Sequence, residues 1–411
     1  MLKLQAAPQP EIHRPPRIGV AVAGGGPLGA IYELGALRAI DESITGLHLH
    51  EVDVYVGVSA GSFIAASLAN HVSTAQMCRI FMGRPEAELS FSPEHFLRPA
   101  YREYGKRLLT LPRIIAGTLW DLIRHPRRYG LTESLNAFSR AIPTGIFDNE
   151  TIHRFILKVL EKPGRTNDFR HLDTRLFIVA VDLDSGQAVR FGADEFPEVP
   201  ISRAVQASAA LPGLYPPVRI GDRDYVDGAL RRTLHASVAL RDGLDLLIGI
   251  NPLVPFAAPR RDGPAHHLVG EGLPLVLAQT FRALIQSRMQ VGLGKYATDF
   301  PHSAILLAEP NRDDEVMFFT NIFSYASRTQ LCEHAYQTTR AELAARADDL
   351  DVFLAPYGFS LDRELLAKSR TLNDSLAHEP RHHAAVSRHL ERTLHRLDRE
   401  LERRVAAPGQ R

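Results

Sequence analysis

The sequence predicts an α/β fold built on a parallel β-sheet. Short apolar runs alternate with segments of helical periodicity in the order strand, helix, strand, helix. Glycine-rich turns follow the first two apolar runs, where the strands are expected to end. Because parallel strands need long crossover connections, usually helices, this alternation is typical of a parallel sheet with helices packed on its faces.

The first predicted strand is the apolar run at residues 18–23. A glycine loop follows it, and apolar residues at helical spacing predict a helix over residues 30–43. A second strand at residues 52–56 leads into a glycine turn at residues 57–61. The small apolar residues 63–68 then predict a buried helix.

Further strands and helices are expected later in the chain. Strand character returns at residues 176–181, 246–250 and 304–308. Small residues at 204–211 predict a short helix that ends at a Pro-Gly pair, and residues 274–296 predict a long helix. The alternation of strands and helices therefore continues through most of the chain.

We divide the chain into a leader, an α/β domain and an extension. The leader, residues 1–17, is rich in proline and is expected to be flexible. The domain covers residues 18–310, and its irregular part at residues 71–150 is interpreted as a helical insertion or cap. Residues 311–411 are expected to form a mostly helical C-terminal extension, in which the leucine spacing after Pro380 predicts an amphipathic helix.

Composition argues against several classes of function. The 411 residues are 45% apolar and 23% charged, as in a soluble globular enzyme, and a net charge of +1 gives no reason to expect nucleic acid as a partner. Two cysteines, no signal-peptide pattern and no apolar run of membrane-spanning length favour a cytoplasmic protein. No histidine or carboxylate cluster has metal-ligand spacing, so we predict no metal and no cofactor. The oligomeric state stays open.

A serine stands at the turn after the second strand. Gly57-Val58-Ser59-Ala60-Gly61 fits the G-x-S-x-G pattern between a predicted strand and a predicted helix. Such a turn holds a nucleophilic hydroxyl above the sheet and at a helix N-terminus, where developing negative charge is favoured. The alternative is a glycine-rich turn that contains a serine by chance.

The glycine loop after the first strand exposes backbone amides that could bind an oxyanion. Its glycines are Gly24, Gly25, Gly26 and Gly29. The segment also fits G-x-G-x-x-G, so a dinucleotide site is the competing interpretation. A ribose-binding acid would stand about 20 residues further on. Asp41 lies too early and Asp53 too late for that role, and a dinucleotide site would leave the serine turn unexplained.

An activated serine needs a proton acceptor. Asp227 stands at the end of an expected strand, in Tyr225-Val226-Asp227-Gly228-Ala229, although Asp-Gly is also a common turn dipeptide. The chain has 18 histidines, of which His235 is the one that follows this aspartate closely. Both residues are candidates for the base.

The three motifs together, in this order and spacing, resemble the patatin-like phospholipase family. The resemblance covers about residues 18–250, and the segment 207–218 is similar to the family's signature before the aspartate. It implies a three-layer α/β/α fold with a mostly parallel sheet. Gly57, Gly61, Gly228 and Ala229 complete the motifs.

The same resemblance implies that Ser59 is the nucleophile and Asp227 the general base, in a dyad without histidine. The amides around Gly25 and Gly26 would form the oxyanion hole, and lipid acyl esters would be cleaved through an acyl-Ser59 intermediate. Two departures are evident. Leu28 stands where many members have arginine, and residues 230–235 lack the usual Asn-x-Pro pattern.

Two other activities stay open at this point. One is a catalytically weak or inactive lipid-binding or scaffold protein on the same fold, and the other is an acyltransferase. A peripheral membrane contact is also a candidate, because residues 111–129 combine Trp120 and Ile123 with Arg124, Arg127 and Arg128. The alternative for this segment is a cap helix packed on the core with its arginines in solvent.

Overall fold

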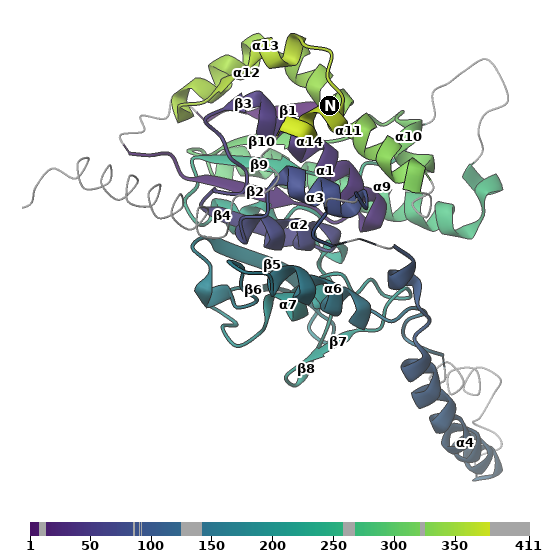
Figure 1. Cartoon of the computed structure of the whole chain (residues 1–411). Coiled ribbons are helices and arrows are strands. Elements are labelled where there is room, and N and C mark those ends of the chain that lie inside the picture. Colours follow the sequence, from purple (N-terminus) through teal and green to yellow (C-terminus); the bar gives the residue numbers. More distant parts are fainter. Residues whose placement is uncertain are drawn as a thin grey trace, which may run out of the picture.

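The centre of the fold is a nine-stranded sheet, within the residues that the computed structural model describes: 1–7, 14–84, 87–89, 91, 93–124, 142–257, 268–320 and 325–378 (Figure 1). The strand order is β1-β10-β9-β2-β4-β5-β8-β7, and β6 pairs with β5. The strands are β1 (Leu2–Gln5), β2 (Ile18–Val22), β4 (Val54–Val58), β5 (Arg175–Asp182), β6 (Ala188–Phe191), β7 (Val218–Ile220), β8 (Arg223–Asp227), β9 (Leu246–Ile250) and β10 (Ala304–Ala308).

The inner strands run parallel, as the alternating sequence pattern predicted. β10, β9, β2, β4 and β5 pair in parallel, whereas β1, β6, β8 and β7 pair antiparallel with their neighbours. The carboxyl ends of neighbouring parallel strands meet at one edge of the sheet, where α/β folds carry their sites. The loops after β2 and β4 therefore leave the sheet side by side.

Helices cover both faces of the sheet and make three layers. Alternate residues of one strand face opposite ways, so Val20 packs into one hydrophobic cluster and Ala21 into another. The first cluster lies under α1, α2, α3, α6 and α7, and the second under α8 and α9. The helices of these layers are α1 (Gly26–Ser43), α2 (Ala60–Ala69), α3 (Thr74–Phe81), α6 (Glu150–Leu160), α7 (Ile201–Ser208), α8 (Ala236–Leu240) and α9 (Leu273–Asp299). The three-layer α/β/α prediction is confirmed.

The C-terminal helices pack on α1 and share its hydrophobic cluster. Gly35 of α1 lies so close to α11 that a Cβ there would come within 2.8 Å of the Ala335 Cβ. Glu42 at the end of α1 accepts a hydrogen bond of 3.0 Å from Arg340 of α11. The elements concerned are α10 (Glu315–Phe319), α11 (Tyr325–Ala345), α12 (Ala347–Leu354), α13 (Arg363–Ala367) and α14 (Leu372–His378), with a small sheet of β3 (Ile44–Thr45) and β11 (Ser360–Leu361). The domain division at residue 310 stays a prediction.

The leader differs from its predicted flexible state. Residues Leu2–Gln5 form β1, which pairs antiparallel with β10 at the sheet edge. Leu2 is buried and Leu4 packs against the core, whereas the alternating polar residues do not join that cluster. This short alternation was too weak a signal beside the prolines that follow it. The amphipathic helix expected after Pro380 lies outside the described residues.

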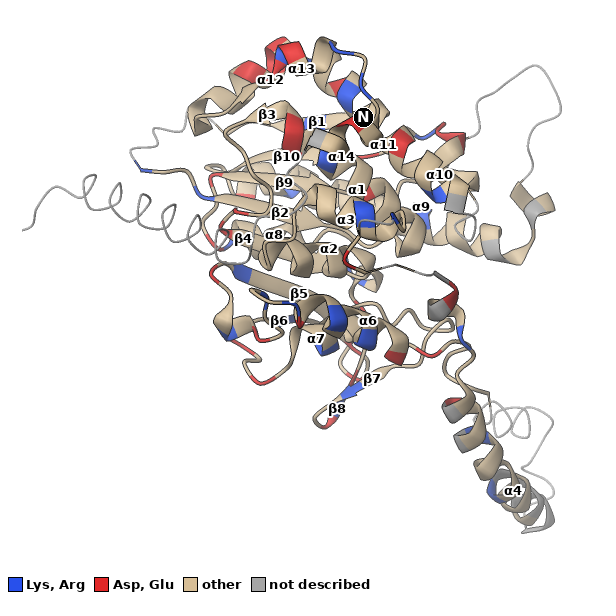
Figure 2. Ribbon diagram, in the orientation of Figure 1, with Lys and Arg blue, Asp and Glu red and all other residues tan. Residues whose placement is uncertain are grey.

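The insertion contains α4 (Tyr101–Arg124), which extends away from the body of the protein (Figure 1). The alternative to membrane contact was a cap helix packed on the core. The exposed side chains of Leu108, Leu109 and Trp120 do not fit that alternative. The side chain of Arg124 and the whole of Arg127 and Arg128 lie outside the described residues. Lys and Arg positions alternate with Asp and Glu positions along the described elements (Figure 2). Among the described residues, no helix is long and apolar enough to cross a bilayer.

Candidate active site

Ser59 stands at the sharp turn between β4 and α2. Its φ of 51° and ψ of −125° are a strained conformation for a residue with a side chain, and such strain concentrates at functional sites. The turn fits because glycines surround it. A Cβ on Gly61 would clash with the backbone carbonyls of Val22 and Ala23, so only glycine allows α2 to begin this close to β2.

Ser208, at the end of α7, holds the backbone of Ser59 in this conformation. The Ser59 amide donates to the Ser208 hydroxyl over 2.8 Å, and that hydroxyl donates to the Val179 carbonyl of β5 over 2.6 Å. Ser208 thus links the turn at Ser59 and helix α7 to strand β5. The sequence interpretation assigned Ser208 no role, although it lies in the 207–218 signature, because the contact spans 149 positions.

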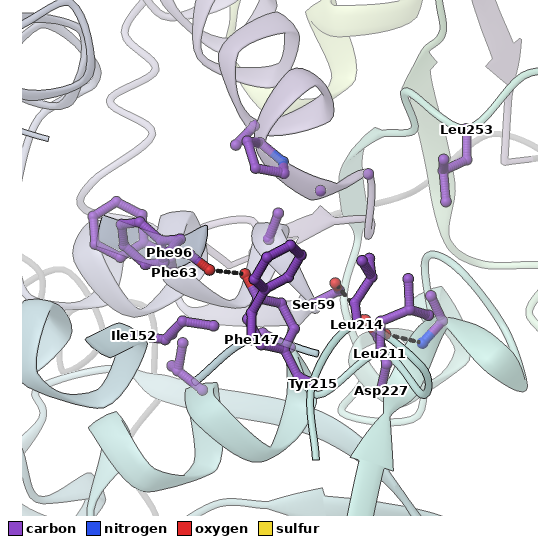
Figure 3. Close-up of a pocket in the computed structure, with 18 of the residues that line it drawn as sticks. Ser59, Phe63, Phe96, Phe147, Ile152, Leu211, Leu214, Tyr215, Asp227 and Leu253 are labelled. Carbon is purple, nitrogen blue, oxygen red and sulfur yellow. Dashed lines mark hydrogen bonds between the residues drawn. The ribbon is translucent and has the colours of Figure 1, made fainter. Parts of the chain in front are cut away.

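Asp227 ends β8 and faces Ser59 directly (Figure 3). The Ser59 Oγ donates to its Oδ2 over 2.7 Å, and the Ala229 amide donates to its Oδ1 over 2.8 Å. The side chain is buried, and removal from water raises the pKa of Asp227 to about 6 despite these two hydrogen bonds. A carboxylate with this pKa is a stronger base than an exposed aspartate and is still ionised at neutral pH.

The glycine loop lies against Ser59. A Cβ on Gly24 would come within 2.9 Å of the Ser59 Cβ and 3.1 Å of the Ala229 Cβ. Gly25 is the N-cap of α1, and Gly26 begins that helix with a φ of 61°. Across the described residues, the amides of Gly25 and Gly26 have no hydrogen-bond acceptor, as expected for the first turn of a helix. They are free to bind an oxyanion.

The motif glycines also allow neighbouring segments to pack closely around the site. Gly25 and Gly29 lie against Pro252, which follows β9. Gly57 lies against α2, and Gly228 lies beneath the carbonyl of Val179. At each of these places a side chain would displace one wall of the site.

His235 is buried, and its ring contacts the loop after Asp227. Its Nε2 lies 3.3 Å from the carbonyl oxygen of Gly228, and its own φ is 46°. Burial lowers the pKa of His235 to about 4, so the ring is neutral at neutral pH. The contact supports the loop that carries Asp227, which here lacks the Asn-x-Pro pattern.

The dinucleotide interpretation finds no support in the placement of its acids. Asp53 accepts a hydrogen bond of 2.9 Å from the Ile18 amide at the start of β2. Asp41 accepts from the Leu49 amide over 2.9 Å. Both carboxylates hold local backbone, at positions remote in the fold from the carboxyl ends of the strands.

A cavity of about 420 Å³ opens beside Ser59 and Asp227. Its wall is almost wholly apolar, which suits an acyl chain. Ring centroids of neighbouring phenylalanines in this wall lie 4.4 to 5.9 Å apart. These residues are Phe63, Phe81, Phe91, Phe96 and Phe155. Figure 3 shows Ile152, Leu211, Leu214 and Tyr215 in the same wall, close to Ser59.

Residues 20–240 match the family described as Patatin-like phospholipase, and this segment carries the glycine loop, Ser59 and Asp227. The chain belongs to the patatin-like phospholipase family. Membership supports a lipid-hydrolase function and the general class of lipid ester hydrolase. The predicted family resemblance is thereby confirmed.

Solved structures similar to this patatin-like chain are distant from it. VipD from Legionella pneumophila shares 19% identity at a TM-score of 0.32, and the match covers 62% of this chain and 52% of VipD. ExoU, in complex with SpcU from Pseudomonas aeruginosa, shares 16% at a TM-score of 0.26, with 89% and 67% covered. Human GIVD cytosolic phospholipase A2, bound to methyl gamma-linolenyl fluorophosphonate, shares 12% at 0.36, with 84% and 60% covered. The chain thus spans about half the length of VipD.

Proposed function

We propose that this protein hydrolyses lipid acyl esters with a Ser59–Asp227 dyad. The observation that carries the proposal is the 2.7 Å hydrogen bond from the Ser59 hydroxyl to Asp227, beside an apolar cavity of about 420 Å³. The hydroxyl is already oriented toward a base, and the cavity offers space for the acyl chain of the ester under attack.

In the first step the Ser59 Oγ attacks the ester carbonyl carbon while its proton moves to Asp227 Oδ2. The carbonyl oxygen becomes an oxyanion, for which the amides of Gly25 and Gly26 are the donors. Collapse of this intermediate breaks the bond to the alkoxide, which takes the proton from Asp227 and leaves an acyl-Ser59. Each well-placed oxyanion donor contributes about 3 kcal/mol to catalysis.

In the second step water attacks the acyl-Ser59 carbonyl and gives its proton to Asp227. The tetrahedral intermediate releases the fatty acid, and Ser59 takes back the proton. An alcohol in place of water would give acyl transfer through the same intermediate.

The test is hydrolysis of short and long p-nitrophenyl acyl esters by the wild type and three variants. Ser59→Ala and Asp227→Asn are expected to lose turnover by more than a thousandfold. His235→Gln is the control for the histidine alternative and is expected to retain most of it. Turnover that survives Ser59→Ala would overturn the proposal. A folded wild type without turnover would favour the lipid-binding interpretation.

We also propose peripheral contact of the 111–129 segment with lipid surfaces. Its described part supports this with Trp120, 60% of which is exposed on a helix that leaves the body of the protein. An exposed indole on a projecting helix is suited to the interface between water and lipid. Trp120→Ala should weaken sedimentation with anionic vesicles, and unchanged sedimentation would remove this proposal.

A further inference from the structure

Arg282 of α9 carries a positive charge into the wall of the active-site cavity. Among the described residues that line this cavity, Asp227 and Arg282 are the two with charged side chains. Asp227 already has Ser59 and Ala229 as partners. Arg282 therefore brings an electrostatic feature that the hydrolytic mechanism does not use.

The guanidinium of Arg282 is held in place but has no counter-ion. Its Cζ lies over the ring of Phe318, 4.7 Å from the centroid, a favourable cation–π contact. In the part of the chain that the structure describes, no carboxylate pairs with it. Partial removal from water lowers its pKa, yet an arginine stays charged in proteins.

A half-buried cation without a partner is unfavourable unless an anion joins it. The glycine loop, which also lines the cavity, carries no cation of its own, because residues 24–30 read Gly-Gly-Gly-Pro-Leu-Gly-Ala. Among the described residues that line the cavity, Arg282 is thus the one cation that an anionic group of the substrate can contact.

We propose that Arg282 binds the phosphate of a phospholipid or lysophospholipid whose ester carbonyl lies at Ser59. This inference rests on the proposed function and names the substrate class of the same site. The planar guanidinium can donate two parallel hydrogen bonds to phosphate oxygens from its N–H edge, while Phe318 packs against the group. The acyl chain then occupies the phenylalanine-lined part of the cavity. Neutral acylglycerols lack the anion and gain nothing from Arg282.

The kinetic test compares lysophosphatidylcholine with a monoacylglycerol that has the same acyl chain. For Arg282→Met, kcat/KM on the lysophospholipid should fall by about tenfold to a hundredfold more than kcat/KM on the monoacylglycerol, as expected for one charge-assisted contact. Arg282→Lys should recover part of this difference. Lys295→Met, which removes an exposed charge from the same helix, should leave the ratio of the two substrates unchanged. Equal losses on both substrates, or no loss, would overturn the proposal.

A binding measurement keeps the inference testable without turnover. Dodecylphosphocholine and decanoate are titrated into Ser59→Ala and into Ser59→Ala with Arg282→Met, both below their micelle concentrations. The second variant should bind dodecylphosphocholine at least tenfold more weakly and decanoate with a smaller loss. Unchanged affinity for dodecylphosphocholine would overturn the role of Arg282 even if no ester is hydrolysed. A loss confined to decanoate would assign the arginine to a fatty-acid carboxylate instead.

Discussion

The hydroxyl of Ser208 connects Ser59 to the sheet, since it accepts from the Ser59 amide over 2.8 Å and donates to the Val179 carbonyl over 2.6 Å. Ser59 needs this support because its φ of 51° is costly for a non-glycine residue. One small side chain thereby stabilises both the strained backbone and the direction of the reactive hydroxyl.

Ser208→Ala should lower kcat by about five- to thirtyfold. The substitution leaves the buried Ser59 amide without an acceptor, which costs about 1 to 2 kcal/mol. It also allows the turn that carries Ser59 to relax. Ser202→Ala is the matched control on the same helix, because the buried Ser202 hydroxyl has no partner among the described residues. Ester hydrolysis and thermal unfolding of both variants measure the effect. Equal kcat in the two variants would show that Ser208 does not support the turn that carries Ser59.

Gly24→Ala should nearly abolish turnover while the protein still folds. The added methyl group would lie 2.9 Å from the Ser59 Cβ, so the loop and the nucleophile must move apart. A displacement of a few tenths of an ångström is enough to misplace the oxyanion donors relative to the attacked carbonyl. Gly117→Ala on α4, where an added Cβ meets no atom of the described residues within 4 Å, is the control. Wild-type kinetics in Gly24→Ala would contradict the close contact.

The pH dependence of kcat/KM should follow Asp227. Because its pKa is raised to about 6, the carboxylate is ionised above that pH and protonated below it. Only the ionised form accepts the Ser59 proton, so kcat/KM should decline about tenfold per pH unit below pH 6 and level off above it. A profile that stays flat down to pH 4.5 would argue against Asp227 as the base.

Asp227→Asn should lower activity but stabilise the fold relative to the wild type as the pH rises. The folded-state pKa of about 6 lies above the unfolded value of 3.8, so the native state holds this proton longer than the unfolded state as the pH rises. The wild type therefore loses stability between about pH 4 and pH 6, by about 3 kcal/mol for a difference of about two pKa units, and the loss persists above pH 6. Asparagine does not titrate, so the unfolding free energy of the variant relative to the wild type should rise by that amount from pH 4 to pH 8. Urea unfolding of both proteins at pH 4 and at pH 8 measures this difference. The same difference in unfolding free energy at the two pH values would contradict the raised pKa.

Ile152→Trp should shorten the acyl chain that the enzyme accepts. Ile152 is a buried residue of α6 in the cavity wall, so a larger side chain reduces the apolar space. Activity on a p-nitrophenyl palmitate should fall at least tenfold relative to activity on p-nitrophenyl acetate. The short ester is the internal control for folding and for the dyad, and an unchanged ratio would mean that the acyl chain lies elsewhere.

The parallel sheet was predictable because it depends on local patterns, whereas the pairing of Ser59 with Asp227 was expected from the family resemblance and stays a proposal. Ser59 and Gly24 stand in glycine turns at strand ends, and Asp227 was recognisable through the family motif around it. The roles that went unseen depend on contacts between distant positions. Ser208 reaches Ser59 from another helix, and Arg282 enters the cavity from α9, whose sequence shows nothing but a long helix. Similarly, β1 becomes a strand because β10 offers a sheet edge.

The most direct test of the central claim is to locate the covalent adduct of an alkyl fluorophosphonate by peptide mass spectrometry. The Ser59 Oγ is expected to form a bond to phosphorus as fluoride leaves and the proton passes to Asp227. The account predicts a phosphonyl mass on the peptide that contains Ser59, in the wild type and in His235→Gln. It predicts much slower labelling in Asp227→Asn and none in Ser59→Ala. A label on another residue, or labelling that requires His235 and not Asp227, would contradict the proposed dyad.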